Sequence, residues 1–97
     1  MGAGEQVFSL REAEALRLGA FALYRKKYGL LSADEVRAIR ERHGLTQAEL
    51  ATLLRLGANT ISRWEARRNV QTAAMDVLLR LIRDVPGSLA YLRSHAA

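Results

Sequence analysis

The feature that most constrains this chain is a repeated helix-start signal, a Ser or Thr followed three residues later by Glu. In such a capping box the hydroxyl and the carboxylate each accept a hydrogen bond from a backbone N–H at the first turn of a helix. The signal occurs at three pairs: Ser9 and Glu12, Ser32 and Glu35, and Thr46 and Glu49. Apolar residues follow each pair at spacings of three and four, which is typical of a helix buried on one face. The sequence therefore predicts helices beginning at these three places.

Helices are expected over most of the chain, because alternating β-branched residues are nearly absent. The expected helices cover residues 10–28, 33–43, 46–54, 58–66 and 73–84, with a last short one reaching residue 94 after the break at Pro86. We therefore predict an all-α fold of five to six helices. Residues 1–8 are expected to be a flexible start, residues 9–31 an amphipathic N-terminal helix and linker, and residues 32–97 one folded domain.

The first expected helix carries its apolar residues on one broad arc, with its basic residues mostly off that arc. The arc contains Leu10, Ala13, Leu16, Ala20, Phe21, Leu23, Tyr24 and Tyr28. The basic run Arg25-Lys26-Lys27 is expected either to keep this helix soluble or to contact a phosphate.

Composition narrows the classes of function. The 97 residues carry a net charge of +5, and a pI of about 10.4 favours a polyanionic partner, either nucleic acid or an acidic membrane surface. The chain has no Cys, which excludes a disulfide scaffold, a thiol nucleophile and a thiolate zinc site. No uncharged run approaches the ~18 residues of a membrane span, and no secretory leader pattern is present, so we expect a cytoplasmic protein without a membrane anchor.

Residues 46–54 and 58–66 have the size of a helix-turn-helix, whose second helix lies in the major groove of DNA. The second helix is expected to turn Ile61 and Trp64 inward. Asn59 and Arg63 are four residues apart and hence on one outward face, and their side chains can bond bidentately to adenine and guanine edges. Thr60 can touch a thymine methyl group or a phosphate. An ordinary solvated polar helix is the alternative, although such a helix more often carries mixed Glu and Lys pairs.

Two stretches of sequence resemble a known family. Residues 41–51 (ERHGLTQAELA) and 60–65 (TISRWE) are similar to the Cro/cI-type (XRE) helix-turn-helix family, over about residues 36–82. This resemblance implies a lambda-repressor-like domain. More narrowly, residues 24–35 (YRKKYGLLSADE) and 57–65 (GANTISRWE) resemble the DNA-binding half of MqsA/YgiT-type antitoxins. Those proteins usually have an N-terminal zinc domain with paired CxxC motifs, so this cysteine-free chain would be a fragment or a shortened relative.

The resemblance implies roles for individual residues. Base reading falls to Asn59 and Arg63, with Ala58 and Thr60 at the same surface. A phosphate contact falls to Gln47 at the start of the first motif helix, where the helix end favours an anion; a solvated Gln is the alternative. The resemblance also implies a buried pair between Arg40 and Glu65 that fixes the helix of residues 33–43 against the recognition helix.

The chain departs from the family pattern at two positions that usually hold Gly. These positions carry Arg55 and Arg67. Arg55 suggests that Gly57 takes over the special backbone conformation of the turn, whereas at Arg67 either the backbone adopts a strained φ or the helix ends later. Basic and polar side chains around the recognition helix are expected to contact phosphates or, equally, only to aid solubility: Arg55, Ser62, Arg67 and Arg68.

No metal site, cofactor or catalytic arrangement is recognisable, and we expect a non-enzyme. The sequence predicts a repressor that binds a palindrome in double-stranded DNA as a homodimer, with a toxin protein as a further partner if the antitoxin resemblance holds. The dimer surface is expected either at Val85, Leu89, Tyr91 and Leu92 or along the first helix. A module that uses the same fold to bind a toxin or bridge partners is the alternative function.

Overall fold

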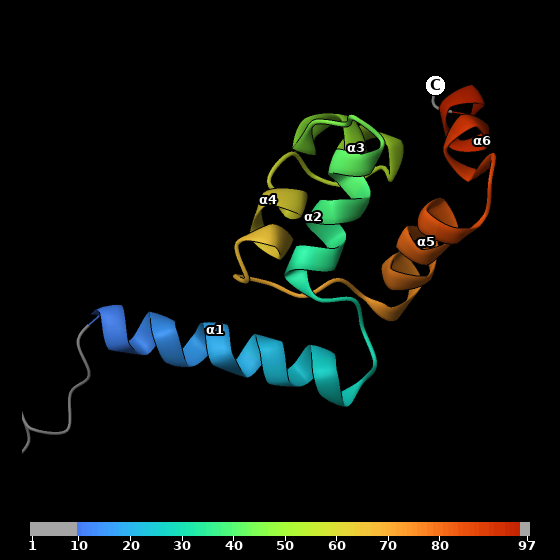
Figure 1. The fold of residues 1–97 in the computed structure, drawn as a ribbon. Helices are drawn as coiled ribbons and strands as arrows, with labels where there is room; N and C mark the ends of the chain where they lie inside the picture. The colour runs from blue at the N-terminus through green and yellow to red at the C-terminus, as the bar shows by residue number, and fades with distance from the viewer. Residues whose placement is uncertain (1–9, 96–97) are drawn as a thin grey trace, which may run out of the picture.

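The computed structural model describes residues 10–95, and they fold into six helices with no strand among them. The helices are α1 (Leu10–Lys27), α2 (Ala33–Arg42), α3 (Gln47–Leu53), α4 (Thr60–Glu65), α5 (Ala73–Asp84) and α6 (Ser88–Ser94) (Figure 1). The all-α prediction is confirmed. The predicted flexible start at residues 1–8 and the predicted cap Ser9 lie outside the described residues. None of the helices within residues 10–95 has the length and apolar content to cross a membrane.

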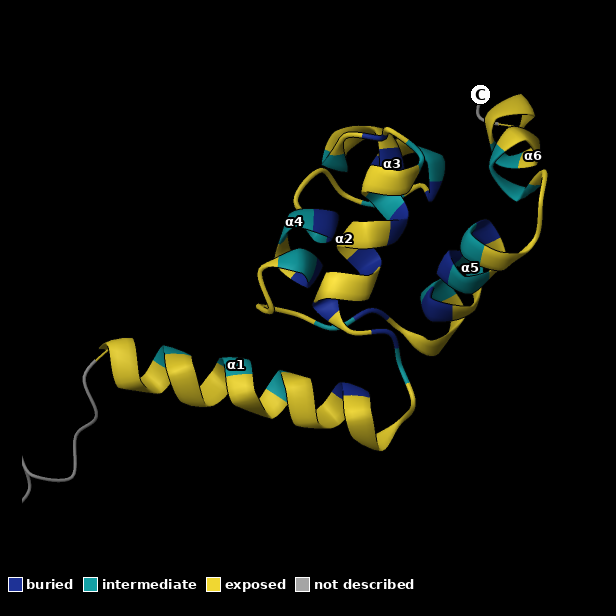
Figure 2. Ribbon diagram, in the orientation of Figure 1, coloured by how far each residue is buried: buried dark blue, intermediate teal, exposed yellow. Residues whose placement is uncertain are grey.

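The hydrophobic core lies among α2, α3, α4 and α5 (Figure 2). Its largest fully buried apolar side chains come from these helices and from the segment before α2: Leu31, Val36, Leu50, Ile61 and Leu79. α6 contributes only the partly buried Leu89 and Leu92 to the edge of this core. The core therefore positions α3 and α4, and α6 is an addition at one side.

Two predicted capping boxes are present in the structure. The Ser32 hydroxyl accepts from the Glu35 backbone N–H, and the Glu35 carboxylate accepts from the Ser32 N–H at 3.0 Å. Thr46 and Glu49 make the same reciprocal pair. These local bonds start α2 and α3 at the expected places, since each satisfies backbone donors that a helix leaves open.

The N-terminal helix α1 is attached by a buried arginine. Arg25 is only 4% exposed, and its Nη2 donates to the backbone oxygens of Trp64 and Asn69 and to the Gln71 side chain at 3.1–3.2 Å. The prediction that Arg25 solubilises α1 or contacts a phosphate is therefore wrong. Burial, and secondarily the nearby charge of Arg67, lowers the pKa of Arg25.

The predicted apolar arc of α1 is mostly exposed. Its leucines and tyrosines are exposed: Leu10, Leu16, Leu23, Tyr24 and Tyr28. The side of α1 that meets the domain instead contains Glu14, Leu18, Phe21 and Arg25, each at least partly buried. The arc was a misleading guide because polar contacts, rather than apolar area, decide which side of α1 is docked.

A buried carboxylate joins the linker after α1 to α5. Asp76 accepts hydrogen bonds from the Leu31 backbone N–H at 2.8 Å, from Gln71 Nε2 at 3.1 Å and from Arg80 Nε at 2.7 Å. Burial alone would raise its pKa, but these three donors outweigh burial and lower the pKa of Asp76 below the ordinary value. Asp76 therefore orders the segment from which α2 starts.

Replacing this carboxylate should destabilise the fold. We expect Asp76→Ala to lower the free energy of unfolding by about 2 kcal/mol, because the buried Leu31 N–H and Gln71 amide lose their acceptor. Urea titration followed by the fluorescence of Trp64 would measure the change. Asp84→Ala is the control, since Asp84 is exposed at the end of the same helix and should leave the midpoint nearly unchanged. Equal losses in the two variants would contradict the assignment.

Candidate nucleic-acid interface

α3 and α4 form two short helices joined by a tight turn (Figure 1). α3 ends at Leu53, the Leu56 N–H donates to the Ala51 oxygen at 2.8 Å, and α4 begins at Thr60. Both helices turn apolar side chains into the core, where Leu50, Ile61 and Trp64 are at most 2% exposed. The opposite side of α4 is left open to solvent.

The open side of α4 contains the predicted base-reading residues. Ala58, Asn59 and Arg63 are exposed and Thr60 is half-buried. The Arg63 backbone N–H donates to the Asn59 backbone oxygen at 3.1 Å, so these two residues lie one helical turn apart on the same side. The Asn59 side chain does not cap the helix, and the Arg63 side chain makes no hydrogen bond or ion pair with any residue in the range 10–95. Both side chains can therefore meet a ligand without breaking a contact.

The ion pair between Arg40 and Glu65 links α2 to the end of α4. Arg40 Nε and Nη2 donate to the two Glu65 oxygens at 2.7 and 2.9 Å, and the two side chains are 12% and 5% exposed. Burial raises the pKa of Glu65, but the hydrogen bonds from Arg40 and Gln47 outweigh it, so the pKa lies below the ordinary value. The hydrogen bond to Glu65 chiefly raises the pKa of Arg40. Both groups are thus ionised near neutral pH.

Gln47, expected at a phosphate, has a contact inside the protein. Its Nε2 donates to Glu65 Oε1 at 3.1 Å, so α3 joins α2 and α4 at the same carboxylate. Ser62 is also engaged, because its hydroxyl donates to the Asn59 oxygen at 2.9 Å. A phosphate contact from either residue stays a prediction.

The two arginines at the usual glycine positions both have left-handed backbones. φ is 58° at Arg55 and 62° at Arg67. The expectation that Gly57 takes the special conformation is wrong, since positive φ in the turn falls on Arg55 itself and a Cβ at Gly57 would make only an ordinary contact at 3.5 Å. At Arg67 the first of the two alternatives is observed. The backbone has a strained, positive φ, and α4 ends before this residue. Such conformations disfavour residues with a Cβ.

The basic side chains before and after α4 have partners that are exposed or only partly buried. Arg67 lies 3.5 Å from Asp34, Arg68 lies 2.9 Å from Glu14, and Arg55 donates to the His95 oxygen at 3.1 Å. Exposed ion pairs of this kind contribute little to stability. These arginines can exchange their partners for another anion at small cost.

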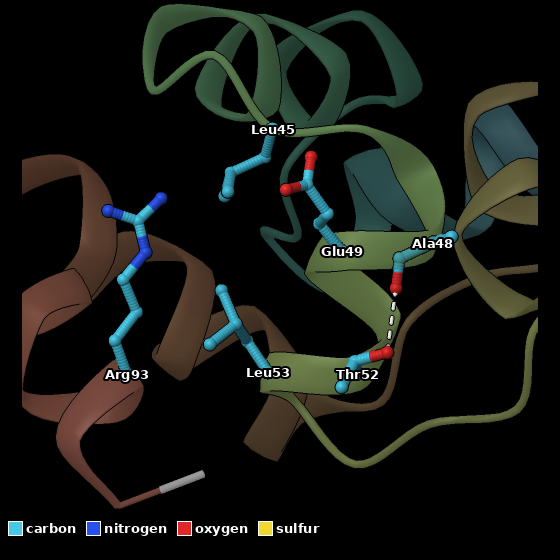
Figure 3. Close-up of a pocket in the computed structure, with 6 residues that line it drawn as sticks. All are labelled: Leu45, Ala48, Glu49, Thr52, Leu53 and Arg93. Carbon is cyan, nitrogen blue, oxygen red and sulfur yellow. Dashed lines mark hydrogen bonds between the residues drawn. The ribbon is translucent and has the colours of Figure 1, made fainter.

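A separate hollow of about 330 Å³ lies between α3 and α6 (Figure 3). Glu49 and Arg93 face each other across it, with Leu45 and Leu53 between them. Hydrogen bonds from the Thr46 backbone and side chain hold the pKa of Glu49 below its usual range, because this carboxylate is part of the α3 cap. The hollow contains neither Asn59 nor Arg63 and does not extend the exposed face of α4.

Comparison with known proteins agrees with this geometry. The helix-turn-helix family model matches residues 36–92, which is more than half of the chain. This chain belongs to the helix-turn-helix family, of the Cro/cI (XRE) type. A curated relative, Antitoxin HigA-2 of Vibrio cholerae serotype O1, is 31% identical over 62 residues. The match covers 64% of this chain and 60% of that protein, so it spans less than two thirds of the relative's length.

Family membership supports a DNA-binding regulator, in which α4 has the place of the recognition helix. The narrower resemblance to MqsA/YgiT-type antitoxins stays a prediction. Sequence reasoning missed the contacts of Arg25, Gln71 and Asp76. A single Arg within a basic run gives no sign of burial, because its acceptors lie 39 to 46 residues further along the chain.

Neutralising Glu65 should loosen α4 and change the response to acid. We expect Glu65→Gln to lower the free energy of unfolding near pH 7 by about 3 kcal/mol, because Arg40 keeps a buried charge without its partner. The native pKa of Glu65 is depressed, so its contribution is present above the unfolded value and is lost as pH falls through the native value. The difference between variant and parent should therefore shrink below about pH 4.

Glu41→Gln is the matched control, because Glu41 on the same side of the domain is 59% exposed and has a weak pair with Arg37 at 3.7 Å. Chemical denaturation at several pH values would compare the three proteins. A constant difference between Glu65→Gln and the parent down to pH 3 would rule out this assignment.

Proposed function

We propose that this protein is a transcriptional repressor that reads a specific sequence of double-stranded DNA. α4 enters the major groove and directs Asn59 and Arg63 at base edges, with Thr60 and Ala58 against neighbouring bases. The observation that carries the proposal is the open side of α4, where Asn59 and Arg63 stand one turn apart with side chains that make no hydrogen bond or ion pair within residues 10–95. A homodimer presents two such helices to a palindromic operator.

Contacts to the DNA backbone come from the residues around α4. Arg55, Arg67 and Arg68 exchange their weak surface partners for phosphates, and Ser62 and Gln47 give up their present hydrogen bonds to join them. Phosphate contacts fix the position of a protein on the duplex without reading its sequence. Strain that is retained at Arg55 and Arg67 is consistent with a functional use of these side chains.

The regulator is further proposed to be the antitoxin of a toxin–antitoxin operon. The similarity to Antitoxin HigA-2 supports this role. In this role the protein represses its own operon, and a toxin partner changes how much of the operator is occupied. Cytoplasmic location follows from the same role.

A protein-interaction module is the second candidate function. It is favoured by an apolar groove of about 380 Å³ between α5 and α6, lined by Leu78, Leu81, Val85 and Tyr91 among others. A module of this kind would bind a partner there and show little preference for DNA sequence. The DNA experiment below separates the two candidates.

Removing the base-reading side chains should abolish sequence preference before it abolishes binding. We expect Arg63→Ala to weaken binding to the selected operator by about 1–3 kcal/mol, with little change on scrambled DNA, because a bidentate base contact is lost. Asn59→Ala should act in the same direction. The operator would first be selected from a random duplex pool, and affinities would then be measured by fluorescence anisotropy.

Arg42→Ala is the matched control, since Arg42 is an exposed arginine at the end of α2 and lies beside α5 rather than α4. It should change operator and scrambled DNA equally and slightly. If the unsubstituted chain selects no sequence, or if both alanine variants keep the parental preference, base reading by α4 is refuted.

Arg67→Gly should move stability and DNA affinity in opposite directions. Glycine relieves the left-handed backbone, so we expect the free energy of unfolding to rise by about 1 kcal/mol. Losing one phosphate contact should reduce the slope of log affinity against log salt by about 0.9. Thermal unfolding and salt titration would measure the two effects. Arg67→Lys keeps both the charge and the strain, so neither quantity should change much; an unchanged salt slope in the Gly variant would count against a phosphate role.

A further inference from the structure

The loop between α4 and α5, residues 66–72, runs alongside α1 (Figure 1). Arg25 of α1 donates from Nη2 to the Trp64 oxygen near the end of α4 and to the Asn69 oxygen in the loop, both at 3.1 Å. One buried guanidinium therefore binds the chain before and after the two arginines of the loop. This contact fixes α1 and the loop relative to each other.

Positive charge is concentrated at this loop. The acceptors of Arg25, two backbone oxygens and the Gln71 side chain, are all neutral. Burial chiefly lowers the pKa of Arg25, and the charge of Arg67 lowers it further, because the two cations are close together. Arg68 is the next residue and is exposed. Three cations in so small a region attract an anion such as a DNA phosphate.

Two carboxylates that precede the helix-turn-helix lie beside these arginines. Glu14 of α1 lies 2.9 Å from Arg68, and Asp34 in the first turn of α2 lies 3.5 Å from Arg67. Both acids come before residue 36, where the match to the family begins. A segment outside the matched domain thus neutralises part of the charge beside the recognition helix.

Glu14 is the better placed of the two acids. Its side chain is 39% exposed, whereas that of Asp34 is 81% exposed, and its distance to the arginine is the shorter one. Glu14 also lies three helical turns before Arg25, on the same side of α1. The docking of α1 through Arg25 therefore keeps the Glu14 carboxylate beside Arg68.

We propose that Glu14 competes with a DNA phosphate for Arg68 and thereby lowers the affinity of this protein for duplex DNA of any sequence. To bind a phosphate, Arg68 has to give up Glu14, whose negative charge also repels the phosphate. Phosphate contacts do not read the bases, so Glu14 changes affinity without changing sequence preference. The inference rests on the phosphate contact that the proposed function assigns to Arg68, and it adds the residue that opposes this contact.

A substitution that changes only charge tests the competition. Glu14→Gln keeps the size of the side chain, and we expect it to raise affinity for a random-sequence duplex about threefold, in line with the strength of a surface ion pair. The slope of log affinity against log salt should become steeper by at most about 0.9, the value for one neutralised phosphate. Fluorescence anisotropy at several salt concentrations would measure both quantities.

Asp84→Asn is the matched control. It also removes one negative charge and breaks a surface pair with an arginine, Arg83, but at the far end of α5. It should raise affinity less than Glu14→Gln does, and both variants should keep the parental thermal midpoint. No gain from Glu14→Gln, or an equal gain from Asp84→Asn, would overturn the proposal.

A double-mutant cycle shows whether Glu14 acts through Arg68. Arg68→Gln alone should weaken binding to every duplex, and adding Glu14→Gln to it should then change affinity little. An equal gain with and without Arg68 would overturn the competition, because Glu14 would then act only through long-range charge. Asp34→Asn should give a smaller gain than Glu14→Gln, and a larger one would refute the assignment to Glu14.

The same measurements separate this inference from the proposed function. If Arg68→Gln weakens DNA binding but Glu14→Gln leaves it unchanged, only the competition is overturned. If Arg68→Gln leaves DNA binding unchanged, the phosphate contact of Arg68 is refuted, and the competition with it. Base reading by Arg63 is decided independently, by the preference for the operator over scrambled DNA.

Discussion

The carboxylate of Glu65 is the point on which the arrangement of the recognition helix depends. It is the last residue of α4, and it accepts from Arg40 of α2 and from Gln47 of α3. Arg40 also donates to the Leu45 oxygen in the loop between α2 and α3 at 2.9 Å. Three helices and one loop are therefore oriented by one buried charge pair. Such a pair adds less to stability than apolar packing would, but its directional bonds fix how the helices are rotated relative to one another.

The recognition helix has only six residues, so it could not persist alone, because isolated helices of this length are unstable in water. Its inner side is held by the burial of Ile61 and Trp64, and its C-terminal end by Glu65 and by Arg25, which binds the Trp64 oxygen. Because those groups hold the helix in place, its structure does not depend on contacts of the Asn59 and Arg63 side chains. The residues that hold this short helix and the proposed base-reading residues thus lie on opposite sides of it.

Much of the domain is predictable from sequence because its signals are local. Capping boxes at Ser32 and Thr46 place the starts of α2 and α3, and the inward spacing of Ile61 and Trp64 gives the orientation of α4. The failures concern interactions between distant residues. Arg25 reads as a solvated base, and the apolar arc of α1 reads as a core face, because nothing near them in the chain reveals the acceptors at Trp64, Asn69 and Gln71. The prediction for Gly57 fails although its signal is local. A glycine adopts positive φ more readily than an arginine, yet the positive φ of the turn lies at Arg55.

The attachment of α1 by Arg25 also implies an order of events during folding. All three acceptors of this guanidinium lie beyond residue 63, in segments that take shape only when α4 and the loop before α5 have formed. During synthesis α1 leaves the ribosome before the rest of this domain, and Arg25 has no acceptors to bind until most of the domain has followed. Its docking through Arg25 therefore follows the formation of α4 and of the loop before α5. Amide hydrogens of α1 should accordingly exchange with solvent before those of α2 and α5.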